Sequence, residues 1–182
     1  MDILGVFLSE HEHVRLMLGV FEEELAEFGD ARNADYEVLG GCIAYCRDFL
    51  DQWHHPREDR LLELISRRDY GVGSSLQALS NQHQDLGRRT AELTHIFHDI
   101  CNCGGVYLRE DLVETGRRLS SSYRQHLDWE ERFLFPAATT VLTDEDWQEL
   151  ASRTSGEADP LSAEPVDRQY RMLFAALADR RP

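Results

Sequence analysis

Six residues of this chain combine metal-binding side chains with positions on apolar helix faces. They are His11, His54, Glu58, His83, His126 and Glu130. His54 precedes Glu58 by four residues, and His126 precedes Glu130 by the same interval, so each pair spans about one helical turn. Imidazole nitrogens and carboxylate oxygens, without a thiolate, suit iron, manganese or zinc. The pattern therefore predicts a metal site inside a helical protein.

The orientation of His11 follows from its neighbours on a regular helix. At about 100° per residue, the positions within about 60° of it are Leu4, Phe7, Leu8, Val14, Leu18 and Leu25. His13 lies on a mixed face, among polar residues such as Ser9, Glu10 and Glu24 as well as apolar ones. We therefore predict that His11 faces the core and that His13 lies on the flank.

The other three histidines also lie on apolar stripes. His54 is aligned with Ile43, Leu50, Leu61 and Ile65, His83 with Leu79, Leu86 and Thr90, and His126 with Leu119 and Phe133. A single inward histidine is most often a hydrogen-bonded core residue, but that reading does not extend to four of them beside two glutamates. Buried Glu58 and Glu130 would carry a heavy desolvation cost without cations, and the basic residues on these stripes lie near their edges. A bound dication turns both glutamates into ligands.

The two His-x3-Glu pairs go further than one metal ion requires. Glu58 and Glu130 can each give one oxygen to each of two ions. Four histidines and two bridging carboxylates then form eight metal–ligand bonds, and a bridging oxygen from solvent raises the number to ten. Two six-coordinate ions have twelve positions, so about two remain open for a small diatomic or peroxide.

Helical periodicity and breaks rich in glycine define the elements that carry these residues. The expected long helices cover about residues 2–28, 34–69, 74–100 and 107–140. A short fifth helix is indicated by the N-cap pattern of Thr143 and Asp146, and a sixth covers 167–177. Long helices with short connections predict an all-α, antiparallel up-down-up-down four-helix bundle with short additional C-terminal helices. We assign residues 1–141 to the bundle and 142–182 to a helical extension packed on it.

Composition limits the partners. The 182 residues suit a single domain, and 19 basic against 34 acidic residues give a net charge of −15. Such a charge repels nucleic acids and anionic membrane surfaces, so we expect neither as a partner. The opening residues lack a basic segment before their short apolar stretch, and no run approaches the roughly 20 apolar residues of a membrane span. We therefore expect a cytoplasmic protein.

The four cysteines do not form a recognisable zinc motif. Cys42 and Cys46 are expected to be buried as small hydrophobic residues. Cys101 and Cys103 lie in an apparent loop, where exposure would allow redox or soft-metal chemistry. Their role stays open.

Four helical segments and the tail resemble the hemerythrin-like, or HHE cation-binding, family. The similar segments are Ser9–Val14, Trp53–Asp59, Asn81–His83, His126–Pro136, Leu142–Trp147 and Asp159–Leu161. The resemblance implies an antiparallel four-helix bundle that holds two iron ions with a bridging oxo or hydroxo group. Members of this family carry or sense oxygen, store or sense iron, handle nitric oxide or break down peroxide.

One position departs from the oxygen-carrying members of that family. They have a second histidine one turn after the ligand on the third helix, whereas here the residue four beyond His83 is Gly87. A missing ligand would open a further coordination position, which favours reactions at two adjacent sites over simple oxygen carriage.

His55 and Tyr123 are two further candidates near the site. A regular helix turns His55 about 100° away from His54, toward an interface. Pro56 disfavours helical geometry at the residue before it, however, and a distorted helix would bring His55 to one iron. Tyr123 lies three residues before His126, from where it could donate a hydrogen bond to a ligand, although an ordinary core aromatic is the simpler interpretation.

The site supports two hypotheses of function. The first is an enzyme, a catalase-like or nitric-oxide-handling oxidoreductase, with peroxide breakdown slightly favoured. The second is a protein that binds or senses O2, NO or iron without catalysis. A structural zinc site is a third reading, against which the lack of cysteine ligands argues. The redox partner is unknown.

Overall fold

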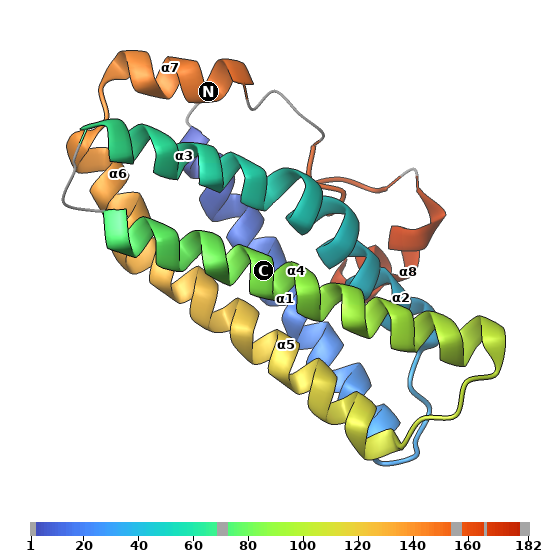
Figure 1. Ribbon diagram of the computed structural model, residues 1–182. Coiled ribbons are helices and arrows are strands. Elements are labelled where there is room, and N and C mark those ends of the chain that lie inside the picture. Colours follow the sequence, from blue (N-terminus) through green and yellow to red (C-terminus); the bar gives the residue numbers. More distant parts are fainter. Residues whose placement is uncertain (1–2, 69–72, 154–157, 166, 179–182) are drawn as a thin grey trace.

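The computed structural model describes residues 3–68, 73–153, 158–165 and 167–178. Within these ranges every regular element is a helix and none is a strand. Four long helical segments lie side by side (Figure 1). They are α1 (Ile3–Gly29); α2 (Tyr36–Ala44), which continues through a π-helical segment (Tyr45–His54) into α3 (His55–Arg68); α4 (Gly73–His98), which continues to Cys103; and α5 (Arg109–Trp129), which continues through a π-helical turn (Glu130–Leu134) into α6 (Phe135–Val141). The sequence predicted these four segments to within a few residues.

Two prolines explain the π-helical turns that end at His54 and Leu134. The amide of His55 bonds to the carbonyl of Leu50, five residues earlier, and Pro56 is the next residue. The amide of Phe135 bonds likewise to the carbonyl of Glu130, and Pro136 is the next residue. Because proline has no amide hydrogen and crowds the preceding turn, the helix widens there. Both widened turns lie beside the candidate ligands.

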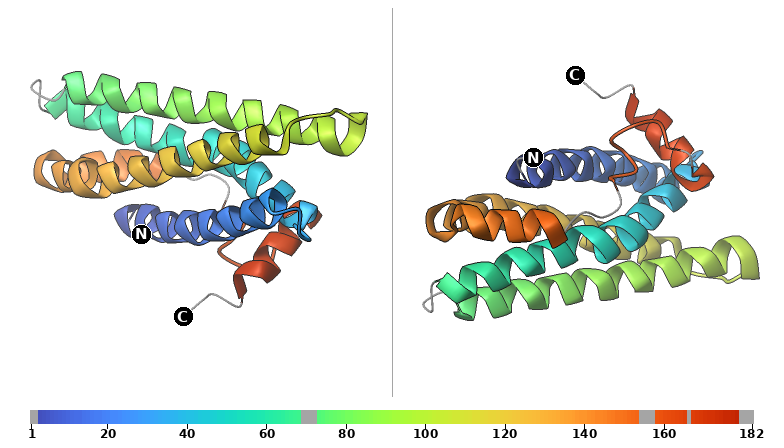
Figure 2. Two further views of the ribbon diagram at one scale, coloured as in Figure 1. Left: turned by 90° about the horizontal axis from the view of Figure 1, so that it is seen from below. Right: turned by 90° about the horizontal axis from the view of Figure 1, so that it is seen from above.

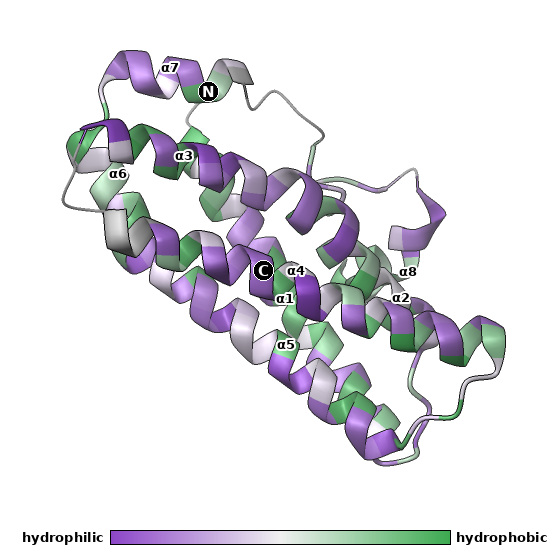
Figure 3. Ribbon diagram, in the orientation of Figure 1, coloured by the Kyte–Doolittle hydropathy of each residue, from purple (hydrophilic) through white to green (hydrophobic). Residues whose placement is uncertain are grey.

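The interior consists of two apolar clusters. One surrounds α2, α5 and the second half of α1, and the other joins the start of α1 to α3 and α6. Hydrophobic and hydrophilic residues alternate along each long helix (Figure 3). On α1, Phe7 belongs to one cluster and Val14 to the other, with His11 between them. The candidate ligands therefore form a polar layer between two apolar layers.

Small residues allow close approach between helices. A Cβ atom on Gly116 would lie 2.5 Å from Cδ1 of Leu25, so α5 packs closely against α1 and a larger residue would have to displace the end of the Leu25 side chain. A Cβ atom on Gly41 would similarly lie 3.0 Å from the carbonyl oxygen of Gln169. This second contact seats α8 against α2.

The C-terminal elements are α7 (Asp144–Arg153) and α8 (Arg168–Ala178). Arg68 of α3 bonds to both carboxylate oxygens of Asp146, and α7 contacts α3 and α1. Helix α8 contacts α2 and α1, and buries Tyr170, Leu173 and Leu177 (Figure 2). Both helices were expected at these positions.

In the described ranges, none of the helices combines the length and apolarity that a membrane span needs.

Candidate metal centre

The structure brings all six predicted residues together in the polar layer. His11, Glu58 and Glu130 have no solvent exposure, and His54, His126 and His83 are 1%, 2% and 7% exposed. They come from α1, from the second and fourth helical segments, and from α4. Burial of two carboxylates among four imidazoles is unusual enough to require an explanation by function.

Glu58 lies between histidines from three helices. Its Oε1 is 3.3 Å from Nε2 of His11 and 3.1 Å from Nε2 of His54. Its Oε2 is 3.6 Å from Nε2 of His83. The two oxygens of one carboxylate therefore face different histidines, as a bridging ligand requires.

Glu130, from the fourth helical segment, also contacts three histidines. Its Oε2 lies 3.4 Å from Nε2 of His11 and 3.3 Å from Nε2 of His126. Its Oε1 lies 3.5 Å from Nε2 of His83. All four imidazoles thus turn Nε2 toward the two carboxylates.

These atoms fit a metal site. Metal–ligand bonds of about 2.1 Å place adjacent ligands about 3 Å apart, close to the nitrogen–oxygen separations here. Several of the atoms are buried without a hydrogen-bond partner among the described residues, namely Nε2 of His54, His83 and His126, Oε2 of Glu58, and both oxygens of Glu130. Orphaned buried polar atoms are costly, and a cation would bind all of them. Groups of His11, His54 and Glu58, and of His55, Glu58, His83 and His126, bring their ligand atoms within 4.8 Å of one another.

Each predicted histidine has a polar partner for its other ring nitrogen. The Nδ1 atoms of His11, His54, His83 and His126 lie 2.9, 2.7, 2.8 and 3.3 Å from Glu131, Glu10, Asp59 and Gln82. When Nδ1 donates to these oxygens, Nε2 presents its lone pair to the centre of the cluster. The partners therefore select the tautomer that can bind a metal.

Two arginines form ion pairs with Glu10 and Glu131, two of the side chains that contact the Nδ1 atoms of the histidines. Arg57 donates to Glu10, and Arg15 donates to Glu131 at 2.7 Å. The positive charges lie outside the ring of histidines, so neither neutralises Glu58 or Glu130 directly. The inner carboxylates are left to draw protons or metal ions.

The pKa values express the same imbalance of charge. Burial opposes a charge on His54, but the carboxylates of Glu58 and Glu10 raise its pKa to about 10. Burial and the neighbouring Glu58 raise the pKa of Glu130 to about 7. Burial and the surrounding histidines lower the pKa of His126 to about 3. Some groups of the cluster therefore hold a proton strongly, whereas others lose it easily. Divalent ions can take the place of the protons that the cluster holds.

His13 lies outside the cluster, as expected. Its Nδ1 is 2.6 Å from Oδ2 of Asp159, whose Oδ1 accepts a hydrogen bond from the hydroxyl of Tyr45. This histidine therefore attaches α1 to the C-terminal segment. Glu10 was assigned to the same mixed face, yet it is only 4% exposed and holds His54. Its position next to His11 was the one available signal of that role.

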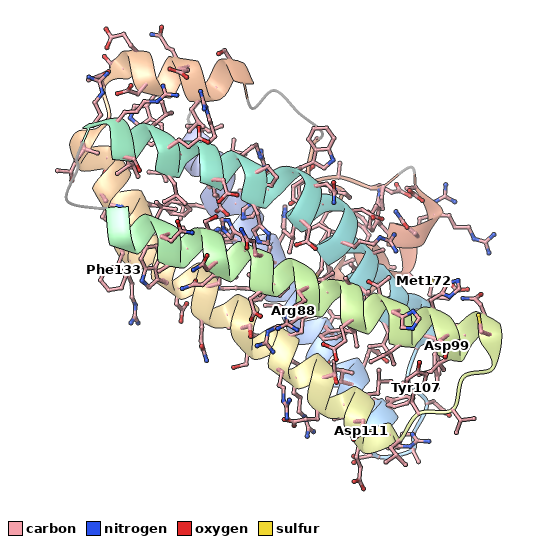
Figure 4. The ribbon with its side chains drawn as sticks, viewed as in Figure 1. Arg88, Asp99, Tyr107, Asp111, Phe133 and Met172 are labelled. Atoms are coloured by element: carbon pink, nitrogen blue, oxygen red, sulfur yellow. The ribbon has the colours of Figure 1, made fainter. Side chains whose placement is uncertain are left out.

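The helical phase was wrong at two positions. Phe133 was expected to face inward with His126, but it is 58% exposed and lies on the outer side of the molecule (Figure 4). The π-helical turn after Trp129 adds a residue and rotates the later part of the helix, so Leu134 and Phe135 are buried instead. Leu8, at the edge of the stripe of His11, is 41% exposed.

The widened turn before Pro56 also places His55 in the cluster. His55 is 3% exposed, and its ring stacks on that of His83 at 4.5 Å between ring centres. Tyr123 is fully buried beside it, and its hydroxyl contacts Oγ1 of Thr90 at 3.3 Å. No histidine contact of the Tyr123 hydroxyl is seen among the described residues, which agrees with a core aromatic.

A pocket of about 440 Å³ lies between α4 and α5, and His126 is the one cluster residue that lines it. Its lining is partly polar and includes Asn81, Gln82, Gln125 and His126. The cysteines lie elsewhere, Cys42 and Cys46 buried as predicted and Cys101 and Cys103 exposed.

Comparison with known proteins adds one finding. No curated protein and no solved structure matches the chain. Residues 2–138 match the family described as the Hemerythrin HHE cation binding domain, and this range contains all the candidate ligands. The buried histidine and glutamate cluster and this match together fit a metal-binding protein. The chain belongs to the hemerythrin HHE cation-binding domain family.

Proposed function

We propose that this chain holds two iron ions between its long helices. His11 and His54 would bind one ion, His83 and His126 the other, and Glu58 and Glu130 both, with an oxo or hydroxo group from solvent as a further bridge. The observation that carries the proposal is the division of the Glu58 oxygens, since Oε1 faces His11 and His54 whereas Oε2 faces His83. The nitrogen and oxygen donors suit iron, manganese and zinc alike. The lack of cysteine argues against structural zinc, and the family favours iron.

The proposal includes the frame around the site. We infer that the four long segments alternate in direction, up, down, up and down, and that residues 1–141 form the binding unit. Residues 142–182 would be an extension packed on it, supported by the bonds of Asp146 to Arg68 and of Asp159 to His13. We expect the protein to act in the cytoplasm.

The favoured activity is the breakdown of peroxide. A bound iron pair supplies two one-electron changes at neighbouring positions. Two peroxide molecules yield one O2 and two waters, so the reaction needs no external electron donor. The apolar layers on both sides exclude water, and a small molecule would approach through the pocket that His126 lines. The four side chains that contact the Nδ1 atoms of the histidines hold the imidazoles in one tautomer while the charge of the site changes.

Reversible binding or sensing of O2, NO or iron is the second candidate function. The position of His55 supports it, because a ring stacked on His83 fills space beside one of the proposed ions. A site with fewer open positions is better suited to holding one small molecule than to activating two.

Oxygen evolution separates these two functions. Iron-loaded protein is mixed with hydrogen peroxide on an oxygen electrode, with a chelator present to remove free iron. We expect one O2 per two peroxide molecules over many turnovers, with the iron retained and with no evolution by Glu58→Gln. Reversible uptake of O2 or NO without oxygen evolution would favour binding. Purified protein that holds a single zinc and no iron would refute the proposed centre.

A further inference from the structure

We propose that His55 is a ligand of the ion held by His83 and His126, and that Asp51 positions it. The inference rests on the proposed dinuclear centre and concerns a residue outside the six predicted ligands. It begins with the backbone. Two consecutive residues of a regular helix point about 100° apart, yet His54 and His55 are both buried, at 1% and 3% exposure. The π-helical segment that ends at His54 makes this possible.

The two consecutive histidines belong to two different groups of ligand atoms. His54 gathers with His11 and Glu58, whereas His55 gathers with Glu58, His83 and His126. Glu58 belongs to both groups. One short segment of the chain therefore supplies a histidine to each side of a shared carboxylate.

The three imidazoles lie close together. The centre of the His55 ring is 4.5 Å from that of His83 and 5.4 Å from that of His126. The His83 and His126 rings are 4.8 Å apart. One ligand atom from each of these three imidazoles and from Glu58 lies within 4.8 Å of the others, so the four side chains can gather around one ion.

Asp51 links this arrangement to Gly87. Oδ1 of Asp51 is buried without a hydrogen-bond partner among the described residues and lies 3.4 Å from Nδ1 of His55. A Cβ atom on Gly87 would lie 3.8 Å from the Asp51 carboxyl group. The space one turn after His83 is therefore taken by the side chain that faces His55. The missing ligand of α4 is replaced from the neighbouring segment, and the expected gap at Gly87 does not remain.

The replacement changes the number of open positions. Five histidines and two bridging carboxylates form nine bonds, and a bridging oxygen from solvent raises the number to eleven of twelve. One position is left, on the ion of His11 and His54.

Iron titration tests the role of His55. Metal-free wild type, His55→Ala, His55→Gln and the control His13→Ala are titrated anaerobically with ferrous iron against a competing chelator. We expect both His55 variants to keep one tightly bound iron and to bind the second at least about tenfold more weakly, since even outer partners of a ligand change affinity by that much. His13→Ala should bind both ions as wild type does. Two irons bound with wild-type affinity by His55→Ala would overturn the role of His55 alone, whereas a wild-type chain that binds fewer than two would overturn the dinuclear centre as well.

A second measurement needs no variant of His55. In cobalt(II)-substituted wild type, each coordinated imidazole with a protonated second nitrogen gives one exchangeable, hyperfine-shifted proton resonance. We expect five such resonances, and four would overturn the proposal. Asp51→Asn should shift one of the five while the others stay in place. An unchanged spectrum would overturn the positioning role of Asp51.

Discussion

Nδ1 of His54 lies 2.7 Å from Oε2 of Glu10, the residue immediately before His11 on another helix. The same relationship recurs around the site. Asp59, next to Glu58, holds His83; Gln82, next to His83, holds His126; and Glu131, next to Glu130, holds His11. Each long segment therefore carries one of the four predicted histidine ligands and orients the histidine of the following segment. The four contacts form a closed ring, so a shift of any one helix disturbs two ligands.

This closed ring of four contacts predicts that Glu10→Gln binds metal more weakly than wild type does. The neutral amide accepts a weaker hydrogen bond from His54 and loses its ion pair with Arg57. We expect iron affinity to fall about 10- to 100-fold, measured by chelator competition. Glu12→Gln, at an exposed position on the same helix, is the matched control and should bind iron as wild type does. Equal iron affinities of Glu10→Gln and Glu12→Gln would argue that the contact of Glu10 with His54 does not support metal binding.

His11→Ala should impair iron binding, whereas His13→Ala should lower stability. His11→Ala removes a candidate ligand, and we expect loss of iron and of peroxide reactivity. His13→Ala leaves the buried Asp159 without one partner and should lower the free energy of unfolding by about 1 kcal/mol while iron binding is kept. Iron analysis and urea unfolding separate the two effects. Equal iron loss in both variants would mean that the position of His13 also matters to the site.

Much of the fold could be predicted because apolar periodicity reports directly on which helix faces are buried. His11 and His83 sit within long regular helices, where a phase of 100° per residue holds over several turns. The same phase failed for Phe133, which lies within a π-helical turn, and left His55 undecided beside another. Pro56 signalled the distortion of the helix but not the direction in which His55 would point.

The side chains that contact the Nδ1 atoms of the histidines were harder to predict. Glu10 lies on a mixed face, and hydropathy alone assigns a carboxylate there to solvent. Its burial depends on His54 and Arg57 from a distant part of the chain, which supply the hydrogen bonds that make burial tolerable. Likewise, Gly87 appeared to leave a gap, and only the packing of Asp51 against it shows how that space is used.

The start of α7 should be sensitive to pH. Asp146 accepts a hydrogen bond from the amide of Thr143, and the Arg68 guanidinium lowers the pKa of its carboxyl group. A lowered carboxyl pKa contributes stability above the ordinary aspartate pKa, and that contribution is lost as the pH falls through the folded value. We expect Asp146→Asn to cost about 1 kcal/mol at neutral pH, with a smaller difference below about pH 4. Urea unfolding at both pH values tests this, with Asp144→Asn as the control; a constant difference would contradict it.

Glu130→Gln should separate stability from metal binding. Burial and Glu58 disfavour the charge on Glu130 in the metal-free protein, so its neutral amide should raise the free energy of unfolding by about 1 kcal/mol or more. Iron at 100 times its dissociation constant should stabilise wild type by about 2.7 kcal/mol and the variant far less. Urea unfolding with iron or with chelator measures both. A variant less stable than wild type without metal, yet equally stabilised by iron, would contradict the bridging role.

Substitutions at Gly87 test how the space beside His83 is used. The Cβ atom of Gly87→Ala meets Asp51 at ordinary contact distance, and alanine favours a helix by up to about 1 kcal/mol over glycine. We therefore expect Gly87→Ala to unfold at a higher urea concentration and to keep its iron and its activity. Gly87→His places an imidazole one turn from His83, where it can reach the same ion, but its ring must displace Asp51. It should then compete with His55 for the ion of His83 and His126, and peroxide turnover should fall. Oxygen evolution and the charge-transfer absorption of the oxidised protein are compared for both variants. Full turnover by Gly87→His with an unchanged iron spectrum would show that this space has no access to the metal centre.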